Sequence, residues 1–316
     1  MDFITKKTTE LTENELLQLK NLFEVVFERP SSVEDFLKSY TSNYLGYSFH
    51  TLIKNDNKIV GSNSLVPINY IIDGDVVRWV NSGGTMISPA CRGIENFYDM
   101  IKESYRNAER EGFTACTGFP NDNSYPLFKG TKLMKDIGKM YTYMLPFRVG
   151  GVKSSLRWLN PLSELFCLGY IYINGLFASK KVSQFRIHKE HGSFDQYRYN
   201  DSIYKTINAG NGKAIYAVII HEGVRTAFIV DITEKSAYNF QKAVKEILKR
   251  EKASMDLILY VGNLPFGNTG LIKVPRKFEP KNFNFTGQIF DKKLVNKDVF
   301  FDFNSWDVNL SSYDLI

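Results

Sequence analysis

Apolar residues recur every three or four positions near the start of the chain, which is the spacing of a helix with one buried face. Residues 11–29 open with a Thr-x-x-Glu capping box and keep this spacing, so they predict a helix that Pro30 ends. The polar run 31–34 caps a second predicted helix, which extends to about Tyr40. With a strand expected near residues 3–8, one strand and two helices precede the long strands.

Longer segments rich in apolar residues then predict a series of strands. Asp73-Gly74, a two-residue hairpin signal, joins the two longest of them. The segment 88–93 interrupts the pattern, and helical spacing returns after it up to Gly112. The predicted strands are 48–54, 58–72, 75–87, 115–119 and 137–146, with a helix over 122–132. The expected order of the first half is therefore β-α-α-β-β-β-α-β-α-β.

The second half repeats part of this order after a connector at residues 150–184. Strand, hairpin, strand, helix and strand occur in both halves, which indicates a second copy of one fold. The predicted strands there are 216–220, 224–232 and 257–260, with an amphipathic helix over 236–251. We predict a mixed α+β or α/β fold, with a mostly antiparallel central sheet flanked by helices in each of two domains, 1–149 and 185–316.

Composition indicates a compact protein of a reducing compartment. Apolar residues make up 43% of the 316 positions and charged residues 23%, which is far from the composition of a disordered chain. Cys91, Cys116 and Cys167 lack Cys-x-x-Cys spacing, so neither a disulfide framework nor a cysteine zinc site is expected. The chain opens without a secretory signal pattern, which favours the cytoplasm.

Charge and apolar runs bound the possible partners. The formal net charge is +6, and residues 151–316 alone have a net charge of +7. Their basic residues are scattered, which fits either a solvated surface or an anion-binding face. No nucleic-acid partner is predicted, and no metal site, because His188 and His191 on one helical face lack a third ligand. The longest apolar run, 165–178, is shorter than the roughly 20 residues that span a bilayer. It predicts a buried connector or, alternatively, an interfacial helix in peripheral contact with a membrane.

Candidate chemistry lies where strand 75–87 passes through a loop into a helix, because the first turn of a helix presents free N–H groups to anions. The run Arg-Gly-Ile-Glu-Asn-Phe occupies 92–97, and Gly-Phe-Pro-Asn and Tyr-Pro-Leu-Phe follow at 118–121 and 125–128. Together with Lys-Ile-Val-Gly at 58–61, these motifs resemble the GNAT acyltransferases. They are most similar to a bacterial subgroup that has a Phe-Pro-Asn element and a second, degenerate GNAT-like domain.

The resemblance implies an acyl-CoA site, with acetyl-CoA as the expected cofactor. The strands 75–87 and 115–119 would splay apart and leave a gap for pantetheine. Met86, Ile87 and Phe119 would line this gap, and a backbone N–H near Ile87 would polarise the acyl carbonyl. The family pattern assigns further cofactor contacts to Arg92, Gly93, Ile94, Glu95, Asn96, Phe97 and Asn121.

Three positions depart from the family pattern. Glu95 stands where the family uses Gly and brings a carboxylate near a diphosphate, so its side chain must point to solvent. Phe97 is bulkier than the usual Gly or Ala. Phe128 stands where many members place the Tyr that protonates the leaving thiolate, which makes Tyr125 the candidate general acid. No obvious general base stands on strand 75–87.

The implied function is transfer of an acetyl or other acyl group from acyl-CoA to a small-molecule amine, such as an amino sugar or glycan precursor. The alternative is a GNAT-shaped binding protein whose Glu95 and Phe128 record lost catalysis. No oligomeric state is predicted. The second half resembles the family only in outline, at Asp231, Gly262, residues 273–275, Trp306, Tyr313 and Asp314.

Overall fold

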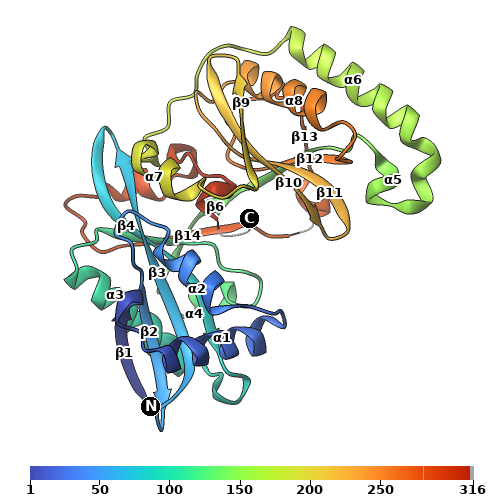
Figure 1. Cartoon of the computed structure of the whole chain (residues 1–316). Coiled ribbons are helices and arrows are strands. Elements are labelled where there is room, and N and C mark those ends of the chain that lie inside the picture. Colours follow the sequence, from blue (N-terminus) through green and yellow to red (C-terminus); the bar gives the residue numbers. More distant parts are fainter. Residues whose placement is uncertain (280, 314–316) are drawn as a thin grey trace. The chain divides into compact units, whose positions relative to one another are not determined.

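The chain divides into two compact units, each with its own sheet (Figure 1). The computed structural model describes residues 1–279 and 281–313, so Asp314 lies outside the described residues. Unit 1 consists of 1–139, 186–199 and 283–306, and unit 2 of 140–185, 200–282 and the residues from 307 on. The units therefore do not follow the limits predicted at residues 149 and 184, because two segments of the second half belong to unit 1.

Unit 1 is built on an eight-stranded sheet with the order β1-β2-β3-β4-β5-β14-β6, and β8 pairs with β3 beside this path. The register is antiparallel at every step except β4–β5, which is parallel because a helix connects these two strands. The strands are β1 (Asp2–Lys7), β2 (Phe49–Asn55), β3 (Lys58–Ile72), β4 (Asp75–Ile87), β5 (Ala115–Gly118), β6 (Lys135–Lys139), β8 (Ile187–Lys189) and β14 (Asn284–Ile289).

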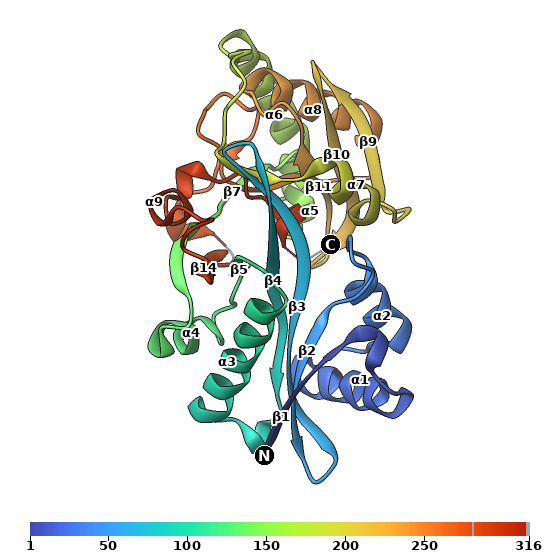
Figure 2. The same cartoon turned by 90° about the vertical axis from the view of Figure 1, so that its left-hand side faces the viewer.

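Helices cover both faces of this sheet. Figure 2 shows α1 and α2 on one side of the β3–β4 hairpin and α3 on the other. Leu19, Phe36 and Leu52 belong to the core under α1 and α2, while Phe97 and Met100 belong to the core under α3 and α4. The helices of unit 1 are α1 (Glu13–Phe27), α2 (Val33–Thr41), α3 (Ile94–Arg110), α4 (Tyr125–Thr131), α7 (His191–Arg198) and α9 (Lys297–Phe300).

Unit 2 is built on a six-stranded sheet with the order β13-β7-β12-β11-β10-β9. Here β11 and β12 form the parallel pair, and α8 connects them. The strands are β7 (Tyr141–Leu145), β9 (Tyr204–Ala209), β10 (Gly212–His221), β11 (Val224–Ile232), β12 (Leu257–Gly262) and β13 (Ile272–Lys273). The helices are α5 (Val149–Val152), α6 (Asn160–Leu176) and α8 (Ala237–Glu251). The predicted fold class, two mostly antiparallel sheets flanked by helices, is confirmed.

The two sheets share one topology, and each takes one strand from the other half of the sequence. In unit 1, β14 lies between β5 and β6, antiparallel to both. In unit 2, β7 lies between β12 and β13, again antiparallel to both. The shared order supports duplication of one fold, with the strand at this sheet position exchanged between the copies.

Three local predictions were wrong. Residues 137–146 form not one strand but two, β6 and β7, which lie in different sheets because their partners β14 and β12 belong to different units. His188 lies in strand β8 whereas His191 begins α7, so the two imidazoles share no helical face. The run 165–178 is no buried connector, because most of its side chains are exposed on α6. Among the described residues, no helix is long and apolar enough to cross a membrane.

Candidate functional site

The site begins at a β-bulge near the end of β4. The register of β3 and β4 shifts by one residue between the pairs Ser64–Gly83 and Ser62–Met86. The extra residue is accommodated at Gly84, whose φ of 58° lies in the left-handed region that favours glycine. A Cβ on Gly84 would also collide with the Tyr40 hydroxyl, so only glycine fits at this position.

The buried side-chain amide of Asn63 stabilises the bulge by hydrogen bonds. The Asn63 side-chain oxygen accepts hydrogen bonds from the Thr85 hydroxyl at 2.7 Å and from the Ser82 hydroxyl at 3.1 Å. Its NH2 group donates to the Ser104 hydroxyl of α3 at 3.1 Å. Because Asn63 has no exposed surface, these bonds satisfy a polar group that would otherwise be costly to bury.

The pairing of β5 with β4 stops before β4 ends. Their parallel pairs end at Ser82 and Gly118, where β5 stops, whereas β4 continues to Ile87. The Ser88 N–H donates to the Val60 carbonyl of β3 at 2.8 Å. Because antiparallel neighbours alternate, the N–H and C=O of Ile87 point away from β3 and toward the side that β5 has left.

Beyond Ser82 the edge of β4 that faced β5 pairs with no described strand, and we call the side of this edge the gap. The start of α3 follows it in the chain after a short loop. Gly93 is the N-cap residue and has no side chain to cap with, so the first-turn N–H groups of residues 94–96 are open to a ligand. The exposed Arg92 folds back and donates from Nε to the Ile87 carbonyl at 3.4 Å. The Asn96 amide donates to the Cys91 carbonyl at 2.9 Å and holds the loop against the helix.

The predicted cofactor residues differ in what they offer. Met86 belongs to the core under α1 and α2, and Ile87 to the core under α3, so these two reach the gap through their backbone rather than their side chains. Phe97 is buried, with its ring centroid 4.9 Å from that of Phe128. Ile94 is exposed in the first turn of α3, where its N–H is one of the open groups.

Glu95 is exposed, as its departure from the family pattern required, but its surroundings are acidic. It lines a shallow pocket of about 320 Å³ between α3 and α4, together with Asp99. The pocket is completed by Ile94, Tyr98, Gly130 and Thr131. Two carboxylates in this pocket would oppose the binding of an anion there.

The Phe-Pro-Asn segment shapes the start of α4. The Asn121 side-chain oxygen accepts from the N–H groups of Asn123 and Ser124 at 3.1 and 3.0 Å, which fixes the turn before the helix. Phe119 stacks on Phe285 of β14, with ring centroids 5.0 Å apart. The strand exchanged from the second half therefore contacts the predicted cofactor residue Phe119.

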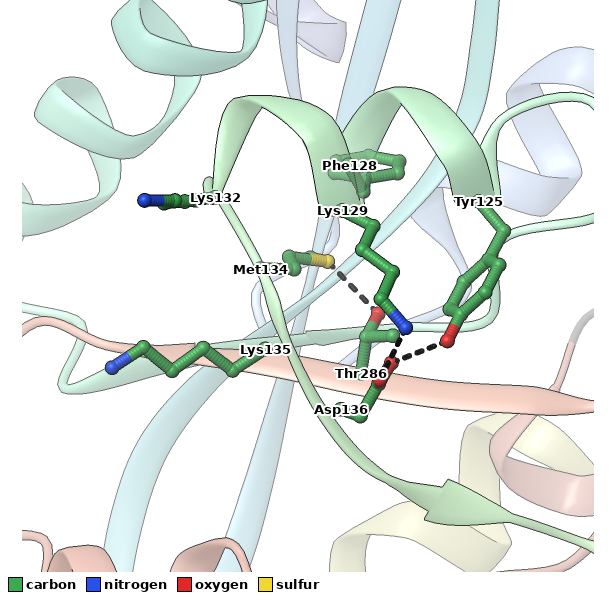
Figure 3. A pocket seen from close by; sticks show the side chains of 8 residues that line it. All are labelled: Tyr125, Phe128, Lys129, Lys132, Met134, Lys135, Asp136 and Thr286. Atoms are coloured by element: carbon green, nitrogen blue, oxygen red, sulfur yellow. Dashed lines mark hydrogen bonds and ion pairs between the residues drawn. The ribbon is translucent and has the colours of Figure 1, made fainter.

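The candidate acid Tyr125 forms a hydrogen bond with a carboxylate, Asp136, that was not predicted from the sequence. Its hydroxyl donates to Asp136 at 2.9 Å, and Figure 3 shows Lys129 reaching the same carboxylate, at 3.6 Å. Burial and the hydrogen bond to Asp136 raise the pKa of Tyr125, so the phenol keeps its proton at neutral pH. These side chains line a pocket of about 240 Å³ beside α4. No local pattern could reveal this pair, because Asp136 lies on β6.

A second polar group near the bulge was also missed. His50 of β2 is fully buried, with Nε2 2.9 Å from the Thr8 hydroxyl and Nδ1 2.9 Å from the Ser64 hydroxyl. Burial lowers the pKa of His50 to about 3, so the imidazole is neutral at physiological pH. The Ser64 hydroxyl lies next to Gly84, so the hydrogen-bonded side chains of His50 and Ser64 reach the bulge.

In unit 2 the end of β11 is the counterpart of the end of β4. The Thr233 N–H donates to the Lys213 carbonyl at 2.9 Å, so Ile232 occupies the place that Ile87 has in unit 1. β11 also carries a register shift just before Asp231. However, the Ile232 N–H donates to the Asp231 carboxylate at 2.8 Å, and the Ser236 side chain caps α8.

Residues 307–312 fill the position that corresponds to the gap of unit 1. Asn309 forms a bridge with Gly262 and donates from its amide to Asp231 at 2.6 Å. The Asn263 N–H donates to the Val308 carbonyl at 2.9 Å. Lys235, which is buried, pairs with Asp307. The chain itself therefore occupies the space between β11 and β12.

The overall fold recurs in solved structures. A GCN5-related N-acetyltransferase from Anabaena variabilis superposes with a TM-score of 0.59 at 12% identity, over 91% of this chain and 73% of that one. The chain has the fold of a GCN5-related N-acetyltransferase. A second such enzyme, from Kribbella flavida, superposes with a TM-score of 0.58 at 11% identity, over 92% and 71% of the two chains.

A third structure comes from Enterococcus faecalis and is described as a conserved protein of unknown function and a probable N-acyltransferase. It superposes with a TM-score of 0.56 at 14% identity, over 92% of this chain and 72% of that one. No protein-family model matches the sequence, and no curated protein matches it significantly. The likeness is therefore one of fold.

Proposed function

We propose that the protein is an acyl-CoA-dependent N-acyltransferase whose cofactor site lies at the end of β4 in unit 1. One observation carries the proposal. The N–H of Ile87 points into the gap that β5 leaves, and the uncapped first turn of α3 follows directly after it. A donor aimed at a carbonyl and a set of donors for a diphosphate thus stand next to each other.

The residues present fit an acyl-CoA. The N–H groups of residues 94–96 and the exposed Arg92 would hold the diphosphate, since a helix N-terminus and a guanidinium both favour anions. The Ile87 N–H would polarise the acyl carbonyl as a preorganised donor. The thioester would supply an activated acyl group to an amine, whose proton would pass to solvent as the amide forms. Tyr125, protonated at neutral pH, is the proposed source of the proton for the leaving thiolate.

A pair of variants tests the role of the Ile87 N–H. Ile87→Pro removes the N–H, whereas Ile87→Val keeps it and changes the side chain by one methylene. We expect kcat/KM for CoA release from acetyl-CoA to fall about 100-fold or more in the Pro variant and to stay near wild type in the Val variant. Equal activity in both variants, with both folded by circular dichroism, would contradict the proposed donor.

For the acceptor we propose an amino sugar or a related glycan-precursor amine. The positive excess of the second half favours an anionic, nucleotide-linked form of such an amine. The assay is CoA release with a panel of nucleotide amino sugars, amino acids and polyamines. Turnover of the amino acids or polyamines alone would reject the sugar and keep the acyltransferase. We also propose a cytoplasmic location, supported by three free cysteines, Cys91, Cys116 and Cys167.

A catalytically lapsed binding protein is the second candidate, because Glu95 and Asp99 line the pocket beside the open helix start. Calorimetric titration with acetyl-CoA at low and moderate salt separates the two candidates. An active enzyme binds, and its affinity weakens with salt because charge holds the diphosphate. Glu95→Gln, which removes only charge, should then raise affinity a few-fold. If wild type fails to bind acetyl-CoA and Glu95→Gln restores binding, the result supports the catalytically lapsed protein.

A further inference from the structure

Helix α6 of unit 2 carries large apolar side chains on two opposite faces. Cys167 and Ile171 belong to the core of unit 2. On the far side, six apolar side chains are between 57% and 68% exposed, and we call them the α6 stripe. They are Leu162, Leu165, Phe166, Tyr172, Ile173 and Leu176. Side chains of this size exposed along one helix face are typical of an interaction surface.

The α6 stripe carries no charge. Glu164 is the one charged residue in the sequence of α6, and it points away from the stripe. It accepts from Arg148 Nε at 2.8 Å and lies 3.4 Å from the Lys252 ammonium. The stripe is extended at both ends by exposed aromatic rings, Trp158 before the helix and Phe177 after it.

Basic residues lie on α8, along one side of α6, and in the segments at both ends of α6. α8 runs antiparallel beside α6, because Lys252 at the end of α8 pairs with Glu164 near the start of α6, while Lys245 lies against Gly175 near its end. The exposed side chains of α8 and the residue after it are cationic: Lys242, Lys245, Lys249, Arg250 and Lys252. The segments flanking α6 add the exposed Lys153, Arg157, Lys180 and Lys181.

We propose that the α6 stripe docks on the surface of a bilayer that contains anionic lipids. A helix that buries apolar and aromatic side chains at the headgroup level, with lysine and arginine around them, has the chemistry of an interfacial membrane helix. Each cation near an anionic surface adds attraction, and the cations of α8 lie beside the stripe. At about 25 Å, α6 is long enough to lie along the surface.

Charge favours a bilayer over a second copy of the chain. A two-fold contact through the α6 stripe would bring the α8 cations of one copy toward those of the other, and like charges repel. An anionic surface satisfies the same cations. The proposal concerns unit 2 alone and does not depend on acyl transfer.

Tryptophan fluorescence tests the proposal without a mutation. Of the three tryptophans, Trp79 and Trp306 are fully buried whereas Trp158 is 75% exposed. Vesicles of phosphatidylcholine with phosphatidylglycerol should shift the emission to the blue, and Trp158→Phe should remove the shift. Vesicles of phosphatidylcholine alone, or high salt, should reduce it. An unchanged spectrum with the anionic vesicles would overturn the proposal.

Co-sedimentation of the full chain with the same vesicles then locates the contact. The double variant Leu165→Glu with Phe166→Glu should lose binding, and Lys245→Glu with Lys249→Glu should weaken it severalfold. Ile220→Glu is the matched control, because Ile220 of β10 is 74% exposed in the same unit but lies outside the stripe, and it should bind as wild type does. Undiminished binding of the Leu165 and Phe166 variant would contradict the proposal. A wild-type dimer that this variant separates would assign the stripe to self-association instead.

Discussion

In unit 1 the N–H of Ile87 faces a gap, whereas in unit 2 the N–H of its counterpart Ile232 already donates to the Asp231 carboxylate at 2.8 Å. The six strands of unit 2 have the same order as β2-β3-β4-β5-β14-β6 of unit 1, and both sheets contain one parallel pair joined by a helix. What differs is a small number of side chains and one segment of chain. Gly93 leaves α3 uncapped, while Ser236 caps α8, and residues 307–312 occupy the space beside β11.

The comparison shows how one topology leaves backbone donors uncapped in unit 1 and caps the corresponding donors in unit 2. Met86 precedes Ile87 in β4 and packs into a core, but the corresponding Asp231 of β11 is a buried acceptor. A buried carboxylate requires partners, and Ile232, Asn309 and Ser311 provide them. Asp231 thus binds the chain itself at the position where unit 1 offers free donors.

The largest expected effect tests how firmly unit 2 is closed. Lys235→Met would leave Asp231 and Asp307 buried without their cation, so we expect the free energy of unfolding to fall by about 3–5 kcal/mol. Urea denaturation measures the loss. Lys242→Met, on the exposed face of α8, is the control and should change stability by less than about 0.5 kcal/mol. Equal stability of both variants would show that the ion cluster does not hold residues 307–312 in place.

Unit 1 holds the opposite kind of cluster, one carboxylate between two lysines. Burial alone would raise the pKa of Glu15, but hydrogen bonds from Lys54, Lys6 and the Thr12 N–H outweigh burial and lower it to about 2. A lowered pKa in the folded state means that the stabilisation is present above the unfolded value of 4.5 and is lost as the pH falls toward 2.

The free energy of unfolding should fall by about 3 kcal/mol as Glu15 becomes protonated, since each pKa unit corresponds to about 1.4 kcal/mol. Glu15→Gln should remove this acid-dependent part, so urea denaturation across that pH range should give a flatter stability profile for the variant. Parallel profiles of wild type and Glu15→Gln would refute the assignment.

The smallest of these effects concerns the bulge that both units share. Gly84→Ala should lower the free energy of unfolding by about 1–3 kcal/mol, because φ at this position is 58° and the new Cβ would meet the Tyr40 hydroxyl. Gly83→Ala is the matched control, since a Cβ there meets open space. In β11 the extra residue is Val230, so the glycine requirement belongs to unit 1. Thermal melting of both variants measures the difference, and equal melting temperatures would disprove the requirement.

Sequence reasoning located what is local and missed what is distant. The strand limits 58–72, 75–87 and 224–232 were predicted to the residue, because hairpin turns and apolar patterns define them within a few positions. The run 92–97 was placed correctly at the start of a helix for the same reason. The exchange of β7 and β14 was not predicted, since the partner of a strand leaves no trace in its own pattern.

The directions of the side chains at the site could not be predicted from the sequence either. Met86 and Ile87 are consecutive residues of one strand, so their side chains point to opposite faces and neither can be assigned to the gap from spacing alone. The partner of Tyr125 lies on β6, and His50 meets Ser64 only because β2 pairs with β3. Contacts between strands decide these positions, and only the fold brings them together.

The most direct test of the central claim is amide hydrogen exchange with and without acetyl-CoA. The account predicts slower exchange at Ile87 and at residues 94–96 when the cofactor is present, with no change at residues 231–236 or 260–263. Protection in unit 2, or binding that leaves the end of β4 and the start of α3 unchanged, would contradict the claim that the open site lies in unit 1.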